Sequence, residues 1–425
     1  MKTASKSGGV ASYLKSHFKK AKVVAGRSEF LKFNQPKAWV STGLRHLDLA
    51  LGGKGIPTGR IIVVSADASK GKTLLGLQIS KSFQNYPKRP GMVHFIETEG
   101  TVDPDWIDKL GVDLSEDALV QPDIKCLEDL FEYVETSGLW HIKHEPNRPV
   151  LHYIDSITVC PPGKVLKASY GDSLKQKGAK AALISAFLEK METPLKRSGN
   201  TLLFISQLRS RISINPMQPI LGDPQTIAGG NSLGFYSSVH IRLKQVWGSE
   251  VFGYDDAKKR DRVYEQEGEQ YEAAIIKSKI SMPYRKAYLY HYFRETAEHS
   301  AGFDAMEGDL NWLVDRDLIF SYQGKDKAKT KAGFNEIHLD SGVYPFLGLV
   351  GWKQIQADPK IFDETWELMK ANNNSRCRKD YEMEKSDGVS TKLDEEDVSK
   401  SIHSLEDLES DLDNLEEEAP DFAVK

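Results

Sequence analysis

The stretch that decides the fold is "GRIIVVSADASKGKT", residues 59–73. Its first half is a short apolar run rich in β-branched residues, which is typical of a buried parallel strand. Its second half ends in Gly71, Lys72 and Thr73. These match the end of the phosphate-binding pattern G-x-x-x-x-G-K-[ST], with Ala66 where the pattern has its first glycine. The sequence therefore predicts a strand that leads into a phosphate-binding loop.

A helix is expected directly after the loop, because Leu74, Leu77 and Phe83 recur at helical spacing. Backbone N–H groups at the start of a helix, together with its dipole, favour a bound anion. A chance match in an ordinary strand–turn–helix is the alternative. We expect a nucleoside triphosphate to contact the loop residues Ala66, Asp67, Ala68, Ser69, Lys70, Gly71, Lys72, Thr73 and Leu74.

The polar side chains near this loop fit a complex of magnesium with a triphosphate. Lys72 can reach the β- and γ-phosphates, and the Thr73 hydroxyl can ligate Mg²⁺. A second carboxylate is expected at the end of a neighbouring strand, and "VLHYID" supplies Asp155 there, so Thr73 and Asp155 are the predicted metal residues. For the group that positions the attacking water, spacing leaves two candidates open, Glu97 and Glu99.

Composition describes a chain with an ample core and no sign of a membrane span. Of 425 residues, 40% are hydrophobic and 28% charged, which fits two or three domains. No apolar run approaches the ~20 residues that a bilayer requires. Three cysteines without paired spacing argue against disulfide or metal frameworks and for a reducing, cytoplasmic location. The basic N-terminus is read as a helical arm, with a transit peptide as the alternative.

Charge is distributed unevenly along the chain. Residues 394–425 hold thirteen acidic residues and two lysines, a net charge of −11, so the remainder carries +7 when the whole chain carries −4. A basic body with an acidic tail indicates a polyanionic partner and a segment that competes with it.

The order of patterns along the chain predicts an α/β protein in four parts. Residues 1–37 form the arm, and residues 38–300 a core with expected strands at 59–66, 91–97, 149–155 and 200–206. Helical stretches between these strands predict a mostly parallel sheet with helices on both faces. Three later strands, beginning with "SVHIRLKQV", are expected to be antiparallel and to extend one edge. Residues 301–371 form a small α/β lobe, and residues 372–425 a disordered acidic tail.

Five ordered blocks resemble the RecA-type strand-exchange recombinases. They are "STGLRHLDLALGGKGIPTGRI", "FIETEGTVDPDWIDKLGVD", "NTLLFISQLRSRI", "LGDPQTIAGGNSLGFYSSV" and "KSKISMP". The resemblance covers roughly residues 38–320 in order, and then the tail. The leucine-spaced acidic tail "LEDLESDLDNLEEE" is most like the phage branch of that family, UvsX. The resemblance implies a RecA-like P-loop NTPase core that uses ATP and Mg²⁺ and hydrolyses ATP when bound to DNA.

The resemblance also assigns roles to particular residues. It selects Glu99 over Glu97 as the residue that activates water, and it makes Gln207 the sensor of the γ-phosphate. It places Asp103 and Trp106 around adenine, although Trp106 also reads as a core anchor on an amphipathic helix. Lys277 and Lys279 match lysines that reach the ATP of a neighbouring subunit, with an exposed strand face as the alternative. The predicted catalytic set is therefore Glu99, Lys72, Gln207, Lys277 and Lys279.

Two loops are expected to grip DNA without reading its sequence, "PGKVLKASYGDSLKQKG" at residues 162–178 and a second loop from Leu208 to Gly230. They predict contacts from Lys164, Lys167, Lys175, Lys177, Arg209, Arg211, Gly229, Gly230 and Asn231. Met217, Ile220 and Leu221 either wedge between bases or pin the second loop to its own domain. Glu272 and Ala274 replace basic residues of the bacterial members, so the duplex site is left open. The lysine run Lys325, Lys327, Lys329 and Lys331 is a candidate replacement for the duplex site, with a solvated loop as the simpler explanation of these charges.

The predicted function is an ATP-dependent DNA recombinase that forms helical filaments on single-stranded DNA and exchanges strands with homologous duplex. The alternatives are a hexameric helicase and a non-catalytic accessory paralogue. Phe30 and Phe33 are expected to insert into the next subunit. Leu405, Leu408, Leu412 and Leu415 give the tail an amphipathic pattern that suits a partner, such as a single-strand-binding protein or a loading mediator.

Overall fold

The computed structural model describes residues 10–17, 27–167, 178–210, 225–227, 231–253, 265–296, 298–321 and 334–374. Within these ranges the core and the small lobe belong to one compact unit, which excludes residues 315–317. No helix of the described ranges is long and apolar enough to cross a bilayer. Residues 375–425 of the acidic tail, which include its four spaced leucines, and the lysine run at 325–331 lie outside the described residues.

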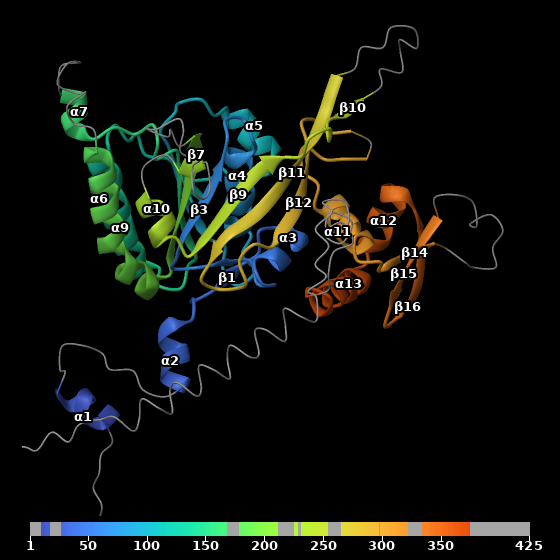
Figure 1. Ribbon diagram of the computed structural model, residues 1–425, viewed down its shortest axis with the longest axis horizontal. Coiled ribbons are helices and arrows are strands. Elements are labelled where there is room, and N and C mark those ends of the chain that lie inside the picture. The colour runs from blue at the N-terminus through green and yellow to red at the C-terminus, as the bar shows by residue number, and fades with distance from the viewer. Residues whose placement is uncertain are drawn as a thin grey trace, which may run out of the picture. The chain divides into compact units, whose positions relative to one another are not determined.

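An eleven-stranded sheet forms the centre of the molecule (Figure 1). Its main path has the order β13-β12-β11-β9-β3-β7-β6-β4-β5. The four strands expected from apolar runs are present as β3 (Ile61–Ala66), β4 (Met92–Glu97), β6 (Val150–Asp155) and β7 (Asn200–Ser210). They run parallel, with the short β5 (Leu119–Val120) beside β4. The prediction of a largely parallel α/β sheet is thus confirmed.

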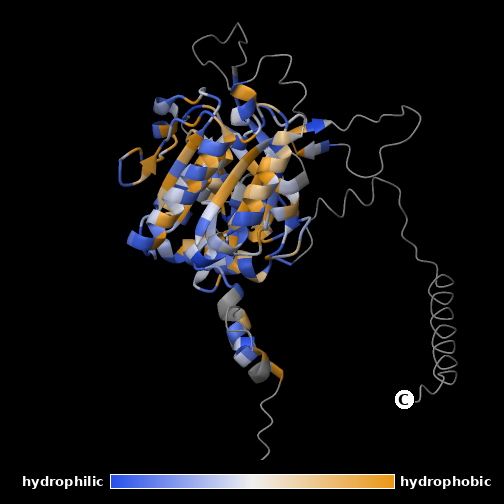
Figure 2. Ribbon diagram, turned by 90° about the vertical axis from the view of Figure 1, so that its left-hand side faces the viewer, coloured by the Kyte–Doolittle hydropathy of each residue, from blue (hydrophilic) through white to orange (hydrophobic). Residues whose placement is uncertain are grey.

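Both faces of the parallel strands are buried, which explains why their sequences are almost continuously apolar. Ile62 and Val64 face a core layer that includes α3 (Arg45–Ala50) and α4 (Lys72–Gln84). Ile61 and Val63 face the opposite layer, formed by α6 (Leu127–His144) and α9 (Ala179–Ser198). Figure 2 shows the hydrophobic residues gathered along these strands and on the helix faces that cover them.

One edge of the sheet departs from the sequence expectation. The strands β9 (Val239–Gln245), β11 (Glu265–Ser278) and β12 (Lys286–Tyr292) do extend this edge, and β11 is antiparallel to both neighbours. However, β9 is parallel to β3, so the prediction that all three are antiparallel was wrong for this strand. The chain returns through α10 (Asn231–Tyr236) before β9, and this crossover lets β9 enter in the direction of β3. The short strands β10 (Val251–Gly253) and β13 (Gly302–Phe303) complete the edge.

The strand β7 is longer than predicted. It was expected to end at Ser206 and to give way to a loop from Leu208, but it continues to Ser210 and pairs with β8 (Gln225–Ile227). Leu208 lies opposite Ile227, and this apolar pair stabilises the ribbon. The sequence of β7 alone could not predict the pair, because the partner lies on β8. The second predicted DNA loop therefore leaves from a two-stranded ribbon.

The small lobe contains a three-stranded antiparallel sheet and three helices. Its strands are β14 (Ile319–Ser321), β15 (Phe334–Leu339) and β16 (Gly342–Leu347). Its helices are α11 (Ala305–Val314), α12 (Gly348–Gln356) and α13 (Pro359–Ala371). The buried Trp352 lies in their shared core and donates a 3.0 Å hydrogen bond to the Met306 carbonyl.

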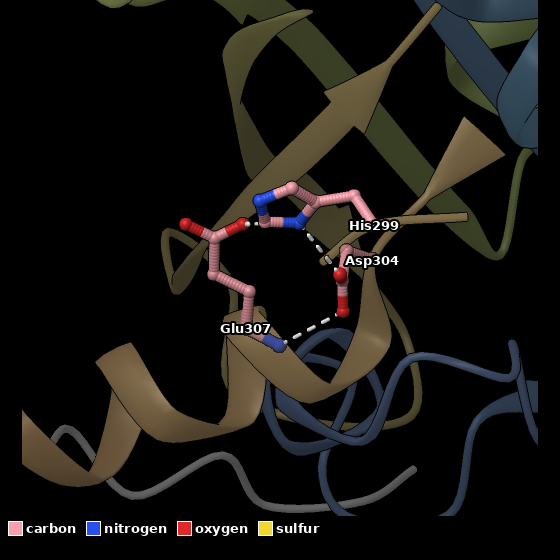
Figure 3. Close-up of side chains that lie close together, drawn as sticks. All are labelled: His299, Asp304 and Glu307. Atoms are coloured by element: carbon pink, nitrogen blue, oxygen red, sulfur yellow. Dashed lines mark hydrogen bonds and ion pairs between the residues drawn. The ribbon is translucent and has the colours of Figure 1, made fainter. Parts of the chain in front are cut away.

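A polar cluster fixes the start of this lobe (Figure 3). The Asp304 carboxylate accepts hydrogen bonds from two backbone N–H groups at the start of α11, and it also contacts His299 and Lys353. Glu307 completes a group of three side chains whose donor atoms are close enough to share a metal ion. The Lys353 ammonium, 2.6 Å from Asp304, already neutralises that carboxylate. We therefore interpret the cluster as a set of structural contacts that hold the start of α11 in place, and not as a metal site.

The N-terminal residues form two short helices and a small ribbon. They are α1 (Val10–His17), α2 (Arg27–Asn34) and the pair β1 (Trp39–Val40) and β2 (Ile56–Pro57). Phe30 on α2 is 61% exposed. An exposed aromatic side chain on an arm suits a contact with another chain, and the sequence analysis predicts such a contact for Phe30.

Candidate nucleotide-binding site

The phosphate loop connects β3 to α4 with a backbone that only certain residues tolerate. Gly71 is left-handed, with φ of 69°, and caps α4, and Ser69 also has a positive φ of 56°. A Cβ on Gly71 would lie 3.0 Å from the ring of Tyr271, so glycine is favoured by its left-handed backbone and avoids a tight contact with this ring. Ala66 is fully buried at the end of β3 and does not have a positive φ, so its methyl group is accommodated.

Lys72 is held inside the loop. Its ammonium donates a 2.6 Å hydrogen bond to the carbonyl oxygen of Asp67, and the residue is only 8% exposed. Burial lowers the pKa of Lys72, and the nearby carboxylates of Asp155 and Glu99 act in the opposite direction. A buried ammonium that faces two carboxylates is poised to bind a polyanion brought with a metal cation.

The two predicted metal residues are in contact. The Thr73 hydroxyl donates a 2.7 Å hydrogen bond to Asp155 Oδ2. Burial raises the pKa of Asp155, which is 5% exposed. The sequence analysis expected this carboxylate on a strand next to β3. Asp155 instead ends β6, which is separated from β3 by β7. A hydroxyl and a carboxylate at this distance are oxygen donors of the kind that Mg²⁺ prefers, so the residues fit the ion.

The two candidate glutamates have different surroundings. The Glu97 carboxylate accepts hydrogen bonds from the backbone N–H groups of Glu99 and Gly100, both at 2.7 Å, and so closes its own turn. The Glu99 carboxylate accepts a 2.8 Å hydrogen bond from the Ser156 hydroxyl and is exposed. The Glu97 carboxylate is thus occupied by hydrogen bonds from backbone N–H groups. The Glu99 carboxylate lies near Asp155 and remains accessible to solvent.

A cavity of about 290 Å³ opens beside the loop. It is lined by loop residues 69–74 and by Trp106, so the structure brings Trp106 to the nucleotide site, where it also packs against the core. Asp103 does not line it and instead caps α5 (Pro104–Lys109) through the Asp105 N–H. The remaining wall was missed from sequence and consists of Glu269, Tyr271, His291 and Phe293. The aromatic run "YLYHYF" was the available signal for part of it.

Gln207 is close to the loop, whereas Lys277 and Lys279 of the predicted catalytic set are not. Gln207 lies opposite Ala66 across the β3–β7 pair. Lys277 lies opposite His240 at the start of β9, the end of that strand away from the phosphate loop, and Lys279 follows the strand and is exposed. The Lys277 ammonium donates to the carbonyl oxygens of Gly234 and Phe235 at 2.8 and 2.6 Å. Within one chain these lysines cannot reach the nucleotide cavity.

The predicted DNA contacts are only partly visible. Lys164 and Lys167 are exposed on α7 (Gly163–Lys167), Arg209 is exposed on β7, and Asn231 begins α10. Lys180, which the sequence interpretation did not single out, lies close enough to Arg209 to interact with it. The others lie outside the described residues, namely Lys175, Lys177, Arg211, Gly229, Gly230, Met217, Ile220 and Leu221.

A phosphate loop, a coupled Thr73–Asp155 pair and an accessible Glu99 at the ends of parallel strands define a P-loop nucleotide hydrolase. The RecA N-terminal domain matches residues 13–297. The chain is similar to Protein RecA of Rhodopirellula baltica, with 33% identity over 68% of this chain and 71% of the relative. It is also similar to Protein RecA of Mesomycoplasma hyopneumoniae, with 28% identity over 68% of this chain and 78% of the relative.

The chain belongs to the RecA family. It is therefore a DNA recombinase that performs ATP-dependent strand exchange and a DNA-dependent ATPase. Proteins of this family bind ATP with Mg²⁺, bind single-stranded and duplex DNA, and form filaments.

Proposed function

We propose that the chain is a recombinase of the phage branch, UvsX, that assembles into a helical filament on single-stranded DNA. In this filament ATP lies between adjacent protomers. The leucine-spaced acidic tail and the basic arm support the assignment to this branch. The proposal keeps the four parts expected from sequence, with the arm at 1–37, the core at 38–300, the lobe at 301–371 and the tail at 372–425. It also keeps a cytoplasmic location, which the buried free thiols of Cys126 and Cys160 support.

The convergence of Lys72, Asp155 and Glu99 is the observation that carries the proposed ATP-hydrolysing site. In this assignment Thr73 and Asp155 would hold Mg²⁺, which would supply positive charge beside the phosphates. Lys72 leaves the Asp67 carbonyl for the phosphates, which are stronger acceptors. Glu99 accepts a proton from the attacking water, and the Ser156 hydroxyl orients its carboxylate. The aromatic walls of the cavity, including Trp106, hold the adenine ring.

Gln207 and the two lysines couple the nucleotide to DNA and to the neighbouring protomer. Gln207 lies beside the phosphate loop and two residues before the exposed Arg209, so a contact with the γ-phosphate can shift the DNA-binding ribbon. Lys277 and Lys279 lie away from their own site, which suits a role at the ATP of a neighbour. Phe30 on the arm contributes to the same contact between protomers.

Electron microscopy with single-stranded DNA and a non-hydrolysable ATP analogue tests the assembly. The proposal expects helical filaments from the wild type and none from a Phe30→Ala, Phe33→Ala double variant whose circular dichroism is unchanged. Closed rings would instead support a helicase. The absence of both assembly and DNA-stimulated ATP hydrolysis would support an accessory protein.

Removal of residues 372–425 tests the role of the tail. If the tail shields the DNA groove, the truncated chain should bind duplex DNA more tightly at low salt, because the net negative charge of the segment is gone. If the tail recruits a single-strand-binding protein or loading mediator instead, duplex affinity should stay the same while loading onto coated single strands is lost.

A further inference from the structure

A tyrosine lies inside the strand that ends in the metal-site carboxylate. Tyr153 precedes Asp155 by two residues on β6, so both side chains point to the same face of the sheet. The phenol is fully buried, and its hydroxyl lies 2.9 Å from Asp155 Oδ2 and 3.1 Å from the Thr73 carbonyl oxygen. A phenol has one proton, and the ionised carboxylate is the stronger acceptor, so the bond to Asp155 dominates.

The same carboxylate oxygen receives two donors from opposite sides. The Thr73 hydroxyl reaches Asp155 Oδ2 from the start of α4 at 2.7 Å, and the Tyr153 hydroxyl reaches it from within β6 at 2.9 Å. These two bonds restrain the carboxylate at Oδ2 and leave Oδ1 for other partners. Its orientation is therefore set by two groups on two different elements.

Helix α4 is built to make room for this phenol. Gly76 lies in the interior of α4, where glycine costs about 1 kcal/mol relative to alanine. A Cβ at Gly76 would lie 2.4 Å from Tyr153 Cζ and 2.5 Å from its hydroxyl oxygen. On its other side the phenol packs against Phe95, with ring centroids 5.0 Å apart. Tyr153 is thus wedged in one position, and the helix tolerates an unfavourable residue to admit it.

We propose that Tyr153 is a positioning residue that orients Asp155 for the metal ion of ATP. Outer hydrogen bonds that fix a metal-binding carboxylate commonly decide the affinity of the site for its metal. Thr73 alone would leave the carboxylate free to rotate about its bond to the hydroxyl. The inference depends on the proposed metal role of Thr73 and Asp155. It adds Tyr153 as a residue that orients Asp155 without binding the metal itself.

The decisive variant is Tyr153→Phe, because it removes one oxygen and keeps the ring against Gly76 and Phe95. The readout is Mn²⁺ as the probe, with free Mn²⁺ counted by electron paramagnetic resonance in the presence of ADP. We expect the affinity for Mn²⁺ to fall by about tenfold. In DNA-stimulated hydrolysis the Mg²⁺ concentration for half-maximal rate should rise in parallel, while the rate at saturating Mg²⁺ stays within about twofold of wild type.

A matched control is Tyr292→Phe. The Tyr292 hydroxyl donates a 2.7 Å hydrogen bond to Glu307 in the polar cluster of Figure 3, and the residue is 4% exposed. This variant also loses a buried phenol–carboxylate bond, but away from the phosphate loop. It should bind Mn²⁺ as the wild type does. A general loss of stability would affect both variants, whereas loss of positioning affects Tyr153→Phe alone.

Asp155→Asn separates the failure of this inference from failure of the proposed function. If Asp155→Asn weakens Mn²⁺ binding and Tyr153→Phe does not, Tyr153 has only a structural role. If Asp155→Asn leaves Mn²⁺ binding unchanged, the metal role of the pair is wrong and the inference is overturned with it. Should Tyr153→Phe not fold, Gly76→Ala pushes the phenol aside without removing it. This variant should weaken Mn²⁺ binding similarly, and wild-type affinity would overturn the inference.

Discussion

The Arg45 guanidinium and the Asp309 carboxylate form a buried ion pair, with 2.6 Å between Nε and Oδ2. The pair joins α3 of the core to α11 of the lobe, and the Asp309 side chain is 1% exposed. The other Asp309 oxygen lies 3.1 Å from His46 Nδ1. Arg45 also donates to Gln356 and to the Phe362 carbonyl, so one side chain ties α3 to three segments of the lobe.

Removing the acidic partner should destabilise the protein strongly. Asp309→Ala leaves the Arg45 charge buried without its carboxylate, so we expect a loss of about 3–5 kcal/mol in the free energy of unfolding. Urea denaturation followed by circular dichroism measures it. The matched control is Glu135→Gln, which breaks the exposed pair with Lys190 and should cost less than about 1 kcal/mol. Equal losses in the two variants would show that the buried pair has no special role.

Three histidines form a buried cluster between β4, β6 and α6. His94 lies 2.8 Å from both Tyr133 and His141, and its ring stacks on His152 at 4.6 Å. His141 in turn contacts Glu145 at 3.0 Å. Burial lowers the pKa of His94 to about 3 and the pKa of His152 well below its ordinary value, and neighbouring positive charge adds to both effects.

The cluster should make the protein sensitive to acid. The unfolded chain takes up protons as pH falls below about 6.5, while the folded chain does not, so stability is present above that pH and is lost below it. We expect His152→Phe to reduce the slope of unfolding free energy between pH 6 and 4 by about 1.4 kcal/mol per pH unit. Denaturant titrations over this range provide the measurement.

The control for the acid slope is Ser137→Ala. It removes the 2.9 Å hydrogen bond to His152 and keeps every ionisable group. Its free energy of unfolding should be lower by a similar amount at each pH, with the slope of the wild type. A flattened slope in this control, or an unchanged slope in His152→Phe, would contradict the explanation.

Replacement of Lys72 tests the phosphate loop directly. Lys72→Ala should reduce DNA-stimulated ATP hydrolysis by at least about a hundredfold, because a buried cation aimed at developing charge is lost. The exposed Lys88→Gln should have the wild-type rate. Steady-state phosphate release measures both variants. Hydrolysis that survives in Lys72→Ala would mean that another cation serves the phosphates.

The two glutamates should respond differently to the same substitution. We expect Glu99→Gln to lower hydrolysis by about a hundredfold or more while DNA binding with ATP is kept, because the base is lost and the cavity is not. Glu97→Gln should cost less than about tenfold, because an amide oxygen still accepts a backbone N–H. Parallel rate and DNA-binding measurements decide between them, and the reverse order of effects would reassign the base to Glu97.

Trp106 tests the position of adenine. Loss of a stacking ring is worth about 1–3 kcal/mol, so Trp106→Ala should raise the KM for ATP by about tenfold. Trp106→Phe keeps a flat ring and should stay close to wild type. Nucleotide titrations at saturating DNA give both values. An unchanged KM in the alanine variant would restrict Trp106 to its packing against the core.

The central strands and the phosphate loop could be predicted because their signals are local. The apolar run at 59–66 predicts the buried strand β3 without reference to any distant residue. Gly71 likewise predicts the left-handed turn that precedes α4. The direction of β9 is not local, since it depends on a crossover through α10 that leaves no mark in the strand itself. The same limit hid the ribbon of β7 and β8, which is fixed by pairing across the chain.

The far wall of the nucleotide cavity could not be predicted for the same reason, because it depends on contacts between residues far apart in the sequence. Tyr271 and His291 come from strands about 200 residues after the loop they face, and their order along the chain says nothing about that contact. The bond from Tyr153 to Asp155 was equally hidden, because a tyrosine in an apolar strand reads as core. Family resemblance supplied Trp106 and Gln207, since it carries spatial information that spacing alone does not.

The grip of Lys277 on the last carbonyls of α10 has a mechanical consequence. This helix begins at Asn231, directly after the second predicted DNA segment, and ends where the ammonium holds it. Any pull on the helix start must then either break two charge-assisted bonds or drag the lysine along. A displacement of α10 would therefore also displace the Lys277 ammonium, which lies on β11.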